Sequence, residues 1–330
     1  MLLTFLILVA MALAIYWACE LFVNSIEWLG SKIGLGETAT GTLLAAFGTA
    51  LPESVVTLVA VAFGTGAGSK DIGVGAALAG PMVLSTITYG IVGLALMANA
   101  KKRGATASTV MVDVDRQNLS RDQAWFMAIF VFKVGLGFVL FAYKPWLGIL
   151  FLAAYGLYVM KELGAEQLAA EDLEPLKFRP NDPVPPMKWV VIQTVLALVM
   201  IFTASHIFVT KVEELGLLLG VAPQVVSLIL SPMATELPET LNALIWVRQG
   251  RERLALANVS GAMMIQATVP SAFGLFFTPW MFDRSLTVSA IVTMLAIGYL
   301  LFMFRRGELS GFKLSLVAWF YLIFAGSLLL

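Results

Sequence analysis

Two acidic segments with the same internal spacing are the chemically informative part of this sequence. Residues 48–54 read Gly-Thr-Ala-Leu-Pro-Glu-Ser and residues 234–240 read Ala-Thr-Glu-Leu-Pro-Glu-Thr. In each segment a threonine, Thr49 or Thr235, stands four residues before a glutamate, Glu53 or Glu239. A helix would put both members of a pair on one face. Two carboxylates and two hydroxyls make an oxygen site of the kind that hard cations such as calcium, and also sodium, prefer.

A proline directly precedes each of these glutamates. Because Pro52 and Pro238 have no backbone N–H, each leaves a carbonyl one turn earlier without its helical donor. Both glutamates fall near the middle of long apolar segments, where a carboxylate in a membrane costs about 2.5–3.5 kcal/mol. Broken helices that expose carbonyls at this depth can bind cations. The alternative is a pair of protonated glutamates that hydrogen-bond to neighbouring helices.

The composition indicates where such segments would reside. The chain has 330 residues, of which 59% are hydrophobic and 13% charged, with a net charge of zero. Its mean hydropathy is +0.89, and soluble domains have about 25% charged residues. A disordered chain is excluded, and a soluble enzyme or a nucleic-acid binder is disfavoured. One cysteine, Cys19, and one histidine, His206, exclude a disulfide framework and a Cys/His metal cluster.

A polytopic membrane protein remains. A spanning helix needs about 20 mostly apolar residues. Ten segments qualify: 2–27, 38–63, 72–98, 123–142, 145–163, 188–210, 223–247, 253–277, 285–304 and 312–330. The first has no basic leading region and no suitable cleavage site, so we expect a retained helix rather than a signal peptide.

Lysine and arginine predict the orientation of these spans. The odd-numbered connections carry 16 of the 21 basic residues and the even-numbered ones carry four. The basic side is cytoplasmic, so both termini are expected outside a cell (inner or cytoplasmic) membrane. The connection 164–187 is rich in proline and acidic residues, as linkers are. It divides the chain into 1–163 and 188–330, with five spans each.

The two halves repeat each other at a constant offset of 186 residues. Phe22-Val23 recurs as Phe208-Val209, and Leu29-Gly30 recurs as Leu215-Gly216. Since each half has an odd number of spans, the second half enters the membrane from the opposite side. The predicted fold is therefore an all-α membrane protein with ten transmembrane helices in two inverted-topology five-helix repeats, which is typical of secondary transporters.

The two acidic segments resemble the paired α-repeat motifs (G-T-S-L-P-E) of the cation/calcium exchanger superfamily, with the sodium/calcium exchanger-like branch as the nearest. Ten spans, a cytoplasmic linker and external termini are also that family's pattern. The resemblance implies alternating-access antiport of a divalent cation, usually calcium, against sodium or protons between spans 2, 3, 7 and 8, with no tightly bound cofactor. It implies Glu53 and Glu239 as central ligands, assisted by oxygens of Thr49 and Thr235 and by the carbonyls of Ala46 and Pro232.

The sequence departs from this family pattern in spans 3 and 8. The family carries G-N-x-x-G-S-N/D there, and its last residue reaches the central ion. This chain reads Gly-Ala-Ala-Leu-Ala-Gly-Pro at 75–81 and Ala-Asn-Val-Ser-Gly-Ala-Met at 257–263. Only Asn258 of the first pair of polar residues is kept. Pro81 and Met263 stand where the ligating amide or carboxylate belongs, so half of the central ligand shell is missing.

Glu236 replaces a small serine of the family motif and stands three residues before Glu239, on the same helix face. Two carboxylates so close favour the binding of a proton by one of them. One interpretation therefore makes Glu236 a proton carrier, and a second makes it a metal ligand that replaces the lost carboxylate. A third is a protonated Glu236 that hydrogen-bonds to a backbone carbonyl.

Other polar residues lie in the predicted spans. Ser85 and Gln266 fall near the midplane and could supply oxygens, although ordinary helix–helix hydrogen bonds are the alternative. Lys133 lies within span 4, where it could neutralise a carboxylate or replace a cation. Pairing with lipid headgroups or a partner subunit is the other interpretation of Lys133.

The leading hypothesis is a secondary-active cation antiporter that exports Ca²⁺ or a related cation in exchange for Na⁺ or H⁺. The alternatives are an antiporter of another divalent or monovalent cation with proton coupling through Glu236, and a non-transporting ion-sensing membrane protein. An enzyme is not expected, because the sequence has no H-E-x-x-H or G-x-S-x-G motif. The expected partners are inorganic cations and the lipid bilayer, without nucleic acid, and the expected state is a monomer.

Overall fold

A computed structural model describes residues 2–36, 39–63, 69–100, 116–163, 173–220, 229, 231–307 and 309–329. This part of the chain is helical and contains no β-strand. Seven helical stretches in it are long and apolar enough to cross a membrane: Leu2–Lys32, Gly73–Ala98, Lys144–Leu163, Met187–Phe208, Glu252–Phe277, Arg284–Arg306 and Gly311–Leu328. These seven fall on predicted spans, and the other three predicted spans, 38–63, 123–142 and 223–247, fall on helices that are interrupted, shifted or only partly described.

The first half begins with α1 (Leu2–Lys32). A continuous helical run follows, consisting of η1 (Thr40–Ala45), α3 (Ala46–Leu58) and η2 (Val59–Phe63). A second run consists of α4 (Ser69–Val83), η3 (Leu84–Thr88) and α5 (Tyr89–Ala98). The segments η1, η2 and η3 are π-helical, and such wider turns are frequent at functional sites. This half ends with α6 (Arg116–Leu136), the short turn η5 (Lys144–Leu147) and α7 (Gly148–Leu163).

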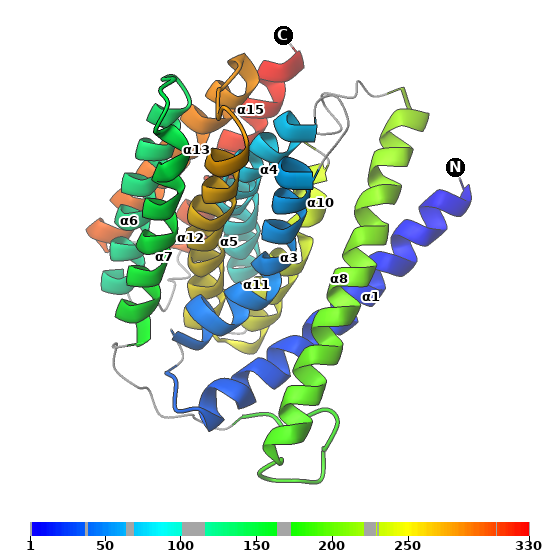
Figure 1. The fold of residues 1–330 in the computed structure, drawn as a ribbon. Coiled ribbons are helices and arrows are strands. Elements are labelled where there is room, and N and C mark those ends of the chain that lie inside the picture. The colour runs from blue at the N-terminus through cyan, green and yellow to red at the C-terminus, as the bar shows by residue number, and fades with distance from the viewer. Residues whose placement is uncertain are drawn as a thin grey trace.

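The second half begins with α8 (Met187–Leu218). Its described helices then are α10 (Ser231–Thr235), α11 (Leu237–Gln249), α12 (Glu252–Phe277), α13 (Arg284–Arg306), α14 (Gly311–Ser315) and α15 (Ala318–Leu329). The start of α1 and the end of α15 lie in the upper part of Figure 1, and the connection between α7 and α8 lies at the bottom. The ends of the described chain therefore lie opposite this connection.

The long helices α1 and α8 pack along each other and cross beside the remaining helices (Figure 1). Each is followed by a glycine with positive φ, 76° at Gly34 and 71° at Gly220. Only glycine adopts this left-handed conformation at no steric cost, and it commonly terminates helices. The two glycines are separated by the repeat offset of 186 residues. Both halves therefore begin with a long helix that ends in the same way.

Helix α12 is the centre of the bundle. It packs against α3, α4, α6, α7 and α11, and nearly all of its side chains are buried. Helix α12 also packs against η1. Gly261 permits this contact, because a Cβ there would lie 2.7 Å from the Cα of Thr42. The bundle therefore brings the helices that carry the two acidic segments, α3 and α10–α11, against one shared partner.

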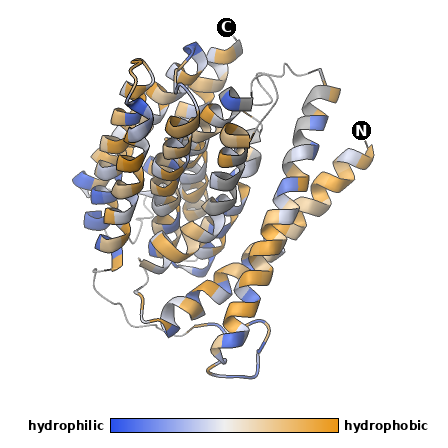
Figure 2. Cartoon of the chain, viewed as in Figure 1, coloured by the Kyte–Doolittle hydropathy of each residue, from blue (hydrophilic) through white to orange (hydrophobic). Residues whose placement is uncertain are grey.

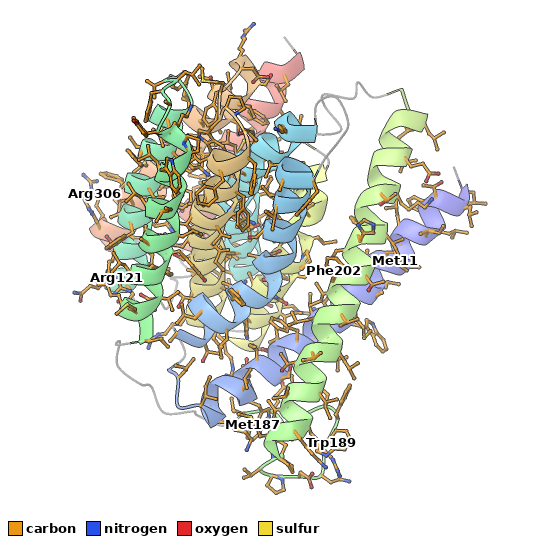
Figure 3. All side chains as sticks on the ribbon, in the orientation of Figure 1. Met11, Arg121, Met187, Trp189, Phe202 and Arg306 are labelled. Atoms are coloured by element: carbon orange, nitrogen blue, oxygen red, sulfur yellow. The ribbon has the colours of Figure 1, made fainter. Side chains whose placement is uncertain are left out.

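The outer surface is apolar over much of its area. Large apolar side chains are exposed along α1, α7, α8 and α15, including Leu3 (71%), Leu157 (58%), Val199 (55%) and Ile323 (62%). Figure 2 shows hydrophobic residues along most of α1, while hydrophilic residues gather at one edge of the bundle and in the α7–α8 connection. Arg121 and Arg306 project at this edge in Figure 3. An apolar surface with polar edges suits a protein surrounded by lipid.

The boundaries predicted for the fourth span are wrong. The span was expected at 123–142, but α6 runs from Arg116 to Leu136. The polar side chains of its second turn are buried by other helices: Asp122 and Gln123 are 1% and 0% exposed. The apolar residues after Leu136 do not continue the helix, and a Cβ on Gly137 would lie 2.5 Å from the ring of Phe282. Hydropathy does not register either contact.

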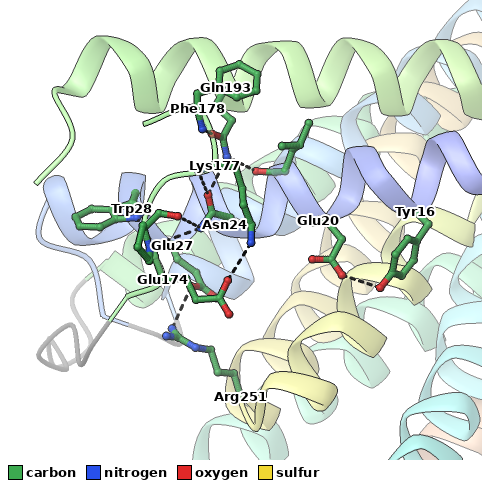
Figure 4. Close-up of polar contacts among 12 residues, drawn as sticks. Tyr16, Glu20, Asn24, Glu27, Trp28, Glu174, Lys177, Phe178, Gln193 and Arg251 are labelled. Atoms are coloured by element: carbon green, nitrogen blue, oxygen red, sulfur yellow. Dashed lines mark hydrogen bonds and ion pairs between the residues drawn. The ribbon is translucent and has the colours of Figure 1, made fainter. Parts of the chain in front are cut away.

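The described part of the α7–α8 connection, residues 173–186, has no helix and is held against α1 (Figure 4). The side chain of Asn24 in α1 donates to the carbonyl of Pro175 at 3.2 Å and accepts from the amide of Lys177 at 3.0 Å. Trp28 donates to the carbonyl of Glu174 at 2.8 Å. At the start of α8, near Met187 and Trp189 in Figure 3, the guanidinium of Arg179 covers the Trp189 ring at 4.6 Å. The connection is therefore attached to α1 and α8.

Candidate functional site

The first acidic segment lies in α3. Thr49 is 4% exposed, and its hydroxyl donates to the carbonyl of Ala45 at 3.1 Å. Ala46, the first residue of α3, is fully buried. Glu53 lies one turn after Thr49, but its side chain is outside the part of the chain that the structure describes. This half of the candidate site therefore has its helix and its threonine in the interior, next to α12.

The second acidic segment is interrupted, whereas α3 runs from Ala46 to Leu58 without a break. Helix α10 ends at Thr235 and α11 begins at Leu237, with Glu236 between them at φ −83° and ψ 5°. Pro238 occupies the first turn of α11 and cannot donate to the carbonyl of Ala234. Directly after this interruption, the Glu239 side chain is 0% exposed. A carboxyl group thus follows a helix interruption inside the protein.

The carbonyl of Pro232 is already occupied in this conformation. It accepts from the hydroxyl of Thr235 at 3.0 Å and from the amide of Glu236 at 3.1 Å. A cation that binds this carbonyl would therefore compete with both donors. Thr235 is only half-buried, whereas Pro232 is buried.

Glu236 and Gln266 meet in the interior, on α10–α11 and α12. Both are nearly or fully buried, at 0% and 2% exposure, and Gln266 Nε2 donates to Glu236 Oε1 at 2.8 Å. Gly80 of α4 lies against this pair: a Cβ at Gly80 would lie 2.7 Å from Gln266 Oε1 and 2.8 Å from Glu236 Oε1. Three segments distant in sequence thus converge on one carboxyl–amide pair, and the missing side chain at Gly80 leaves the space for it.

The repeat offset relates this pair to the first half. Position 236 corresponds to Ala50 and position 266 to Gly80. The second half therefore carries a carboxyl and an amide where the first half carries a methyl group and a hydrogen. The site is asymmetric, and the added polar groups come from α10–α11 and α12.

Asn258 of α12 is fully buried, and neither its Oδ1 nor its Nδ2 has a hydrogen-bond partner within the described residues. Asn242 of α11 is in the same situation. A buried amide without a partner costs about 1–3 kcal/mol, so each is suited to meet a ligand or a water molecule. Asn258 lies beside η1, since a Cβ at Gly41 would lie 3.2 Å from its backbone nitrogen.

The hydroxyls of η3 have different partners. Ser85 donates to the carbonyl of Met82 at 3.1 Å and so bonds within its own helix, and its oxygen lone pairs stay available for acceptance. Thr88 is hydrogen-bonded to Thr240 of α11 at 2.8 Å. This contact joins spans 3 and 7 and was missed from the sequence. Asn242 was missed as well, although it stands three residues after Glu239 on the same face of α11.

A second group of buried acids was also missed, because both acids stand at the ends of predicted spans, where charged residues are expected. Asp122 and Glu162 are 1% and 0% exposed, and both pair with Arg121. Asp122 also accepts from Ser260 at 3.3 Å, and Glu162 accepts from Thr42 at 3.3 Å. The group connects α6, α7 and η1 to α12 two residues from Asn258.

Among the described side chains, no three His, Cys, Asp or Glu lie close enough together to hold a metal ion. The candidate residues instead offer two carboxyls, amides, hydroxyls and carbonyls, all of which have oxygen atoms that could bind a cation. Those that were predicted from sequence and are buried are Thr49, Ala46, Pro232, Glu236, Glu239, Asn258, Ser85 and Gln266.

The family model described as "Sodium/calcium exchanger protein" matches residues 3–162 and 189–330. The chain belongs to the sodium/calcium exchanger family. This is a family of secondary transporters, not of enzymes. A curated relative, "Putative antiporter CaxA" of Alkalimonas amylolytica, is 24% identical over 314 residues, which cover 93% of this chain and 91% of the relative.

Solved structures of the sodium-calcium exchanger NCX_Mj share the fold. The form soaked with 2.5 mM Na⁺ and 0.1 mM Ca²⁺ superposes with a TM-score of 0.76 at 18% identity, over 99% of this chain and 98% of that one. The form without Na⁺ and Ca²⁺ gives a TM-score of 0.73 at 18% identity, over 99% of both chains. In this fold Pro81 of α4 and Met263 of α12 are buried apolar residues.

Proposed function

We propose that this chain is a secondary-active antiporter that exports Ca²⁺ or a related cation across the cell membrane in exchange for Na⁺ or H⁺. Membership of the sodium/calcium exchanger family supports cation antiport. The similarity to a protein named as an antiporter supports it further. The ion and the coupling partner are inferred from the site.

The observation that carries the proposal is the fully buried Glu239 directly after the helix interruption at Glu236. A carboxyl buried in a membrane-spanning bundle is expensive unless it binds a cation or a proton. We infer that Glu239 and Glu53 bind the cation from opposite halves of the chain. The remaining proposed oxygen donors are Thr49, Thr235, Ala46, Pro232, Asn258, Ser85, Gln266 and Glu236.

The proposed architecture is ten transmembrane helices in two inverted repeats, 1–163 and 188–330, joined by a cytoplasmic linker at 164–187. The glycines that end α1 and α8 with the same positive φ support this arrangement. The ends of the described chain lie opposite the linker (Figure 1), in agreement with external termini. Alternating access would then involve movement of the α1–α8 pair against the bundle that holds the site.

Glu236 determines which ion is coupled. As an ionised carboxylate it accepts the Gln266 amide hydrogen at 2.8 Å and adds a ligand oxygen. As a protonated acid it carries the exchanged proton. Both alternatives use the same position, so flux measurements rather than geometry distinguish them.

The test is uptake into proteoliposomes that contain the purified protein. Ca²⁺ uptake is expected to follow an outward Na⁺ or H⁺ gradient, with the two gradients varied independently. Glu53→Gln and Glu239→Gln are expected to abolish the flux. The matched control is Glu214→Gln on the exposed end of α8, where the carboxyl pairs with Lys211 at 2.5 Å; it is expected to retain flux. Unchanged flux in both central variants would refute the assignment. Uptake of another cation in place of Ca²⁺ would replace Ca²⁺ as the assigned transported ion.

A further inference from the structure

Lys133 of α6 is fully buried, although it carries one of the few charged groups inside a span. Its Nζ donates to the carbonyl of Ala77 in α4 at 2.9 Å and to the hydroxyl of Ser271 in α12 at 3.2 Å. It also lies 4.6 Å from the centre of the Phe130 ring. The lysine therefore points into the bundle, and the expectation of contacts with lipid headgroups or a partner subunit does not describe it.

Pro81 explains why the carbonyl of Ala77 is available. In an α-helix the backbone N–H of residue 81 would donate to the carbonyl of Ala77. Position 81 is a proline, which has no N–H. The ammonium group of Lys133 replaces the missing donor. Pro81 stands where the family has an ion ligand, and it also leaves the carbonyl of Ala77 free to accept from Lys133.

The surroundings of Nζ are those of a small monovalent cation. They comprise a carbonyl oxygen, a hydroxyl oxygen and an aromatic face, and each of these attracts positive charge. Within the described residues, no carboxylate lies at ion-pair distance from Lys133. The described part of the chain therefore offers its charge carbonyl, hydroxyl and aromatic contacts but no ion pair.

The helices that hold Lys133 also hold the Glu236–Gln266 pair. Ala77 lies three residues before Gly80 in α4, and Ser271 lies five residues after Gln266 in α12. Gly80 and Gln266 both meet Glu236. The ammonium group and this pair are therefore held by the same two helices inside the bundle, where dielectric screening is weak.

We propose that Lys133 is a resident cation of this exchanger: its ammonium group fills a monovalent-cation position between α4, α6 and α12 and replaces one of the positive charges that the site would otherwise bind from solution. The number of exchanged charges rests on the proposed antiport function, whereas the existence of the cation position does not. Removing the resident charge leaves the site carboxyls with one uncompensated negative charge, so one more cation or proton must bind in each cycle.

The first test is the zero-flux potential of Lys133→Met in proteoliposomes. The membrane potential at which opposing ion gradients give no net Ca²⁺ flux reports the number of charges per cycle, and it does not depend on how much protein is active. We expect Lys133→Met to change this number by one relative to the parent protein. An active Lys133→Met with an unchanged charge number overturns the proposal.

The second test decides the case in which Lys133→Met does not transport. In detergent, propylammonium should raise the unfolding midpoint of Lys133→Ala more than 1-propanol does, because the substitution removes three carbons and an ammonium group and propylammonium restores both the volume and the charge. Lys144→Ala is the positive control for refilling a vacated ammonium position: Lys144 is 2% exposed and donates to the carbonyls of Val139, Pro279 and Trp280 in a turn outside the bundle core. Equal effects of propylammonium and 1-propanol on Lys133→Ala overturn the proposal. If the parent protein transports no cation, the antiport proposal fails while this measurement still decides the cation position.

Discussion

The replacement Gly80→Ala offers a sharp test of the site, because it adds one methyl group beside the Glu236–Gln266 pair. The new Cβ would lie 2.7 Å from Gln266 Oε1, 2.8 Å from Glu236 Oε1 and 3.0 Å from Gln266 Cδ. All of these separations are below an ordinary van der Waals contact. Since the two oxygens belong to the ends of flexible side chains, the side chains will turn away and their 2.8 Å hydrogen bond will break.

The magnitude follows from that bond. A hydrogen bond to a charged group contributes about 1.5–3 kcal/mol, which corresponds to about a 10- to 150-fold change in affinity. We therefore expect the half-saturating cargo concentration of Gly80→Ala to rise within this range. The helix itself should not suffer, since alanine in a helix is about 0.5–1 kcal/mol more favourable than glycine.

Gly75→Ala is the matched control. It makes the same change in the same helix, but there the nearest atom to a new Cβ is Leu286 Cδ2 at 4.0 Å. Concentration-dependent cation uptake into proteoliposomes and thermal unfolding in detergent are measured for both variants. Weaker cargo binding in Gly80→Ala alone is expected. If both variants bind cargo equally well, the Glu236–Gln266 pair is not part of the site.

Two further predictions concern Glu236 and the end of α1. Glu236→Ser is expected to reduce uptake driven by a pH gradient more than uptake driven by a Na⁺ gradient; an unchanged dependence on the pH gradient would refute Glu236 as the proton carrier. Glu27 accepts from Trp246 Nε1 at 2.8 Å and pairs with Arg251 at 3.2 Å, so Glu27→Ala should destabilise the protein by about 1.5–3 kcal/mol. Its unfolding midpoint should fall below that of Glu20→Ala, whose carboxyl pairs with Tyr16 alone at 2.7 Å among the described contacts; equal midpoints would contradict this.

Local patterns were sufficient for the class of protein, but not for the interruption in α10–α11. Pro52 and Pro238 stand at equivalent positions and both lack a backbone donor, yet α3 runs from Ala46 to Leu58 without a break. The roles of Gly80 and Gly261 could not be predicted from local patterns either. A glycine in an apolar helix is compatible with many surroundings, and only the packing of α4 and α12 shows which atoms occupy the space of its missing side chain.

The sequence by itself determined a membrane protein with paired acidic motifs at a constant offset, because hydropathy and spacing are properties of neighbouring residues. The tertiary structure alone decided that Glu236 meets Gln266 and that Lys133 turns inward to Ala77 and Ser271. These partners lie on different helices, and the rotation and depth of each helix depend on packing against its neighbours. The sequence thus identifies the few charged residues inside the spans, and the contacts between helices determine the partners of each one.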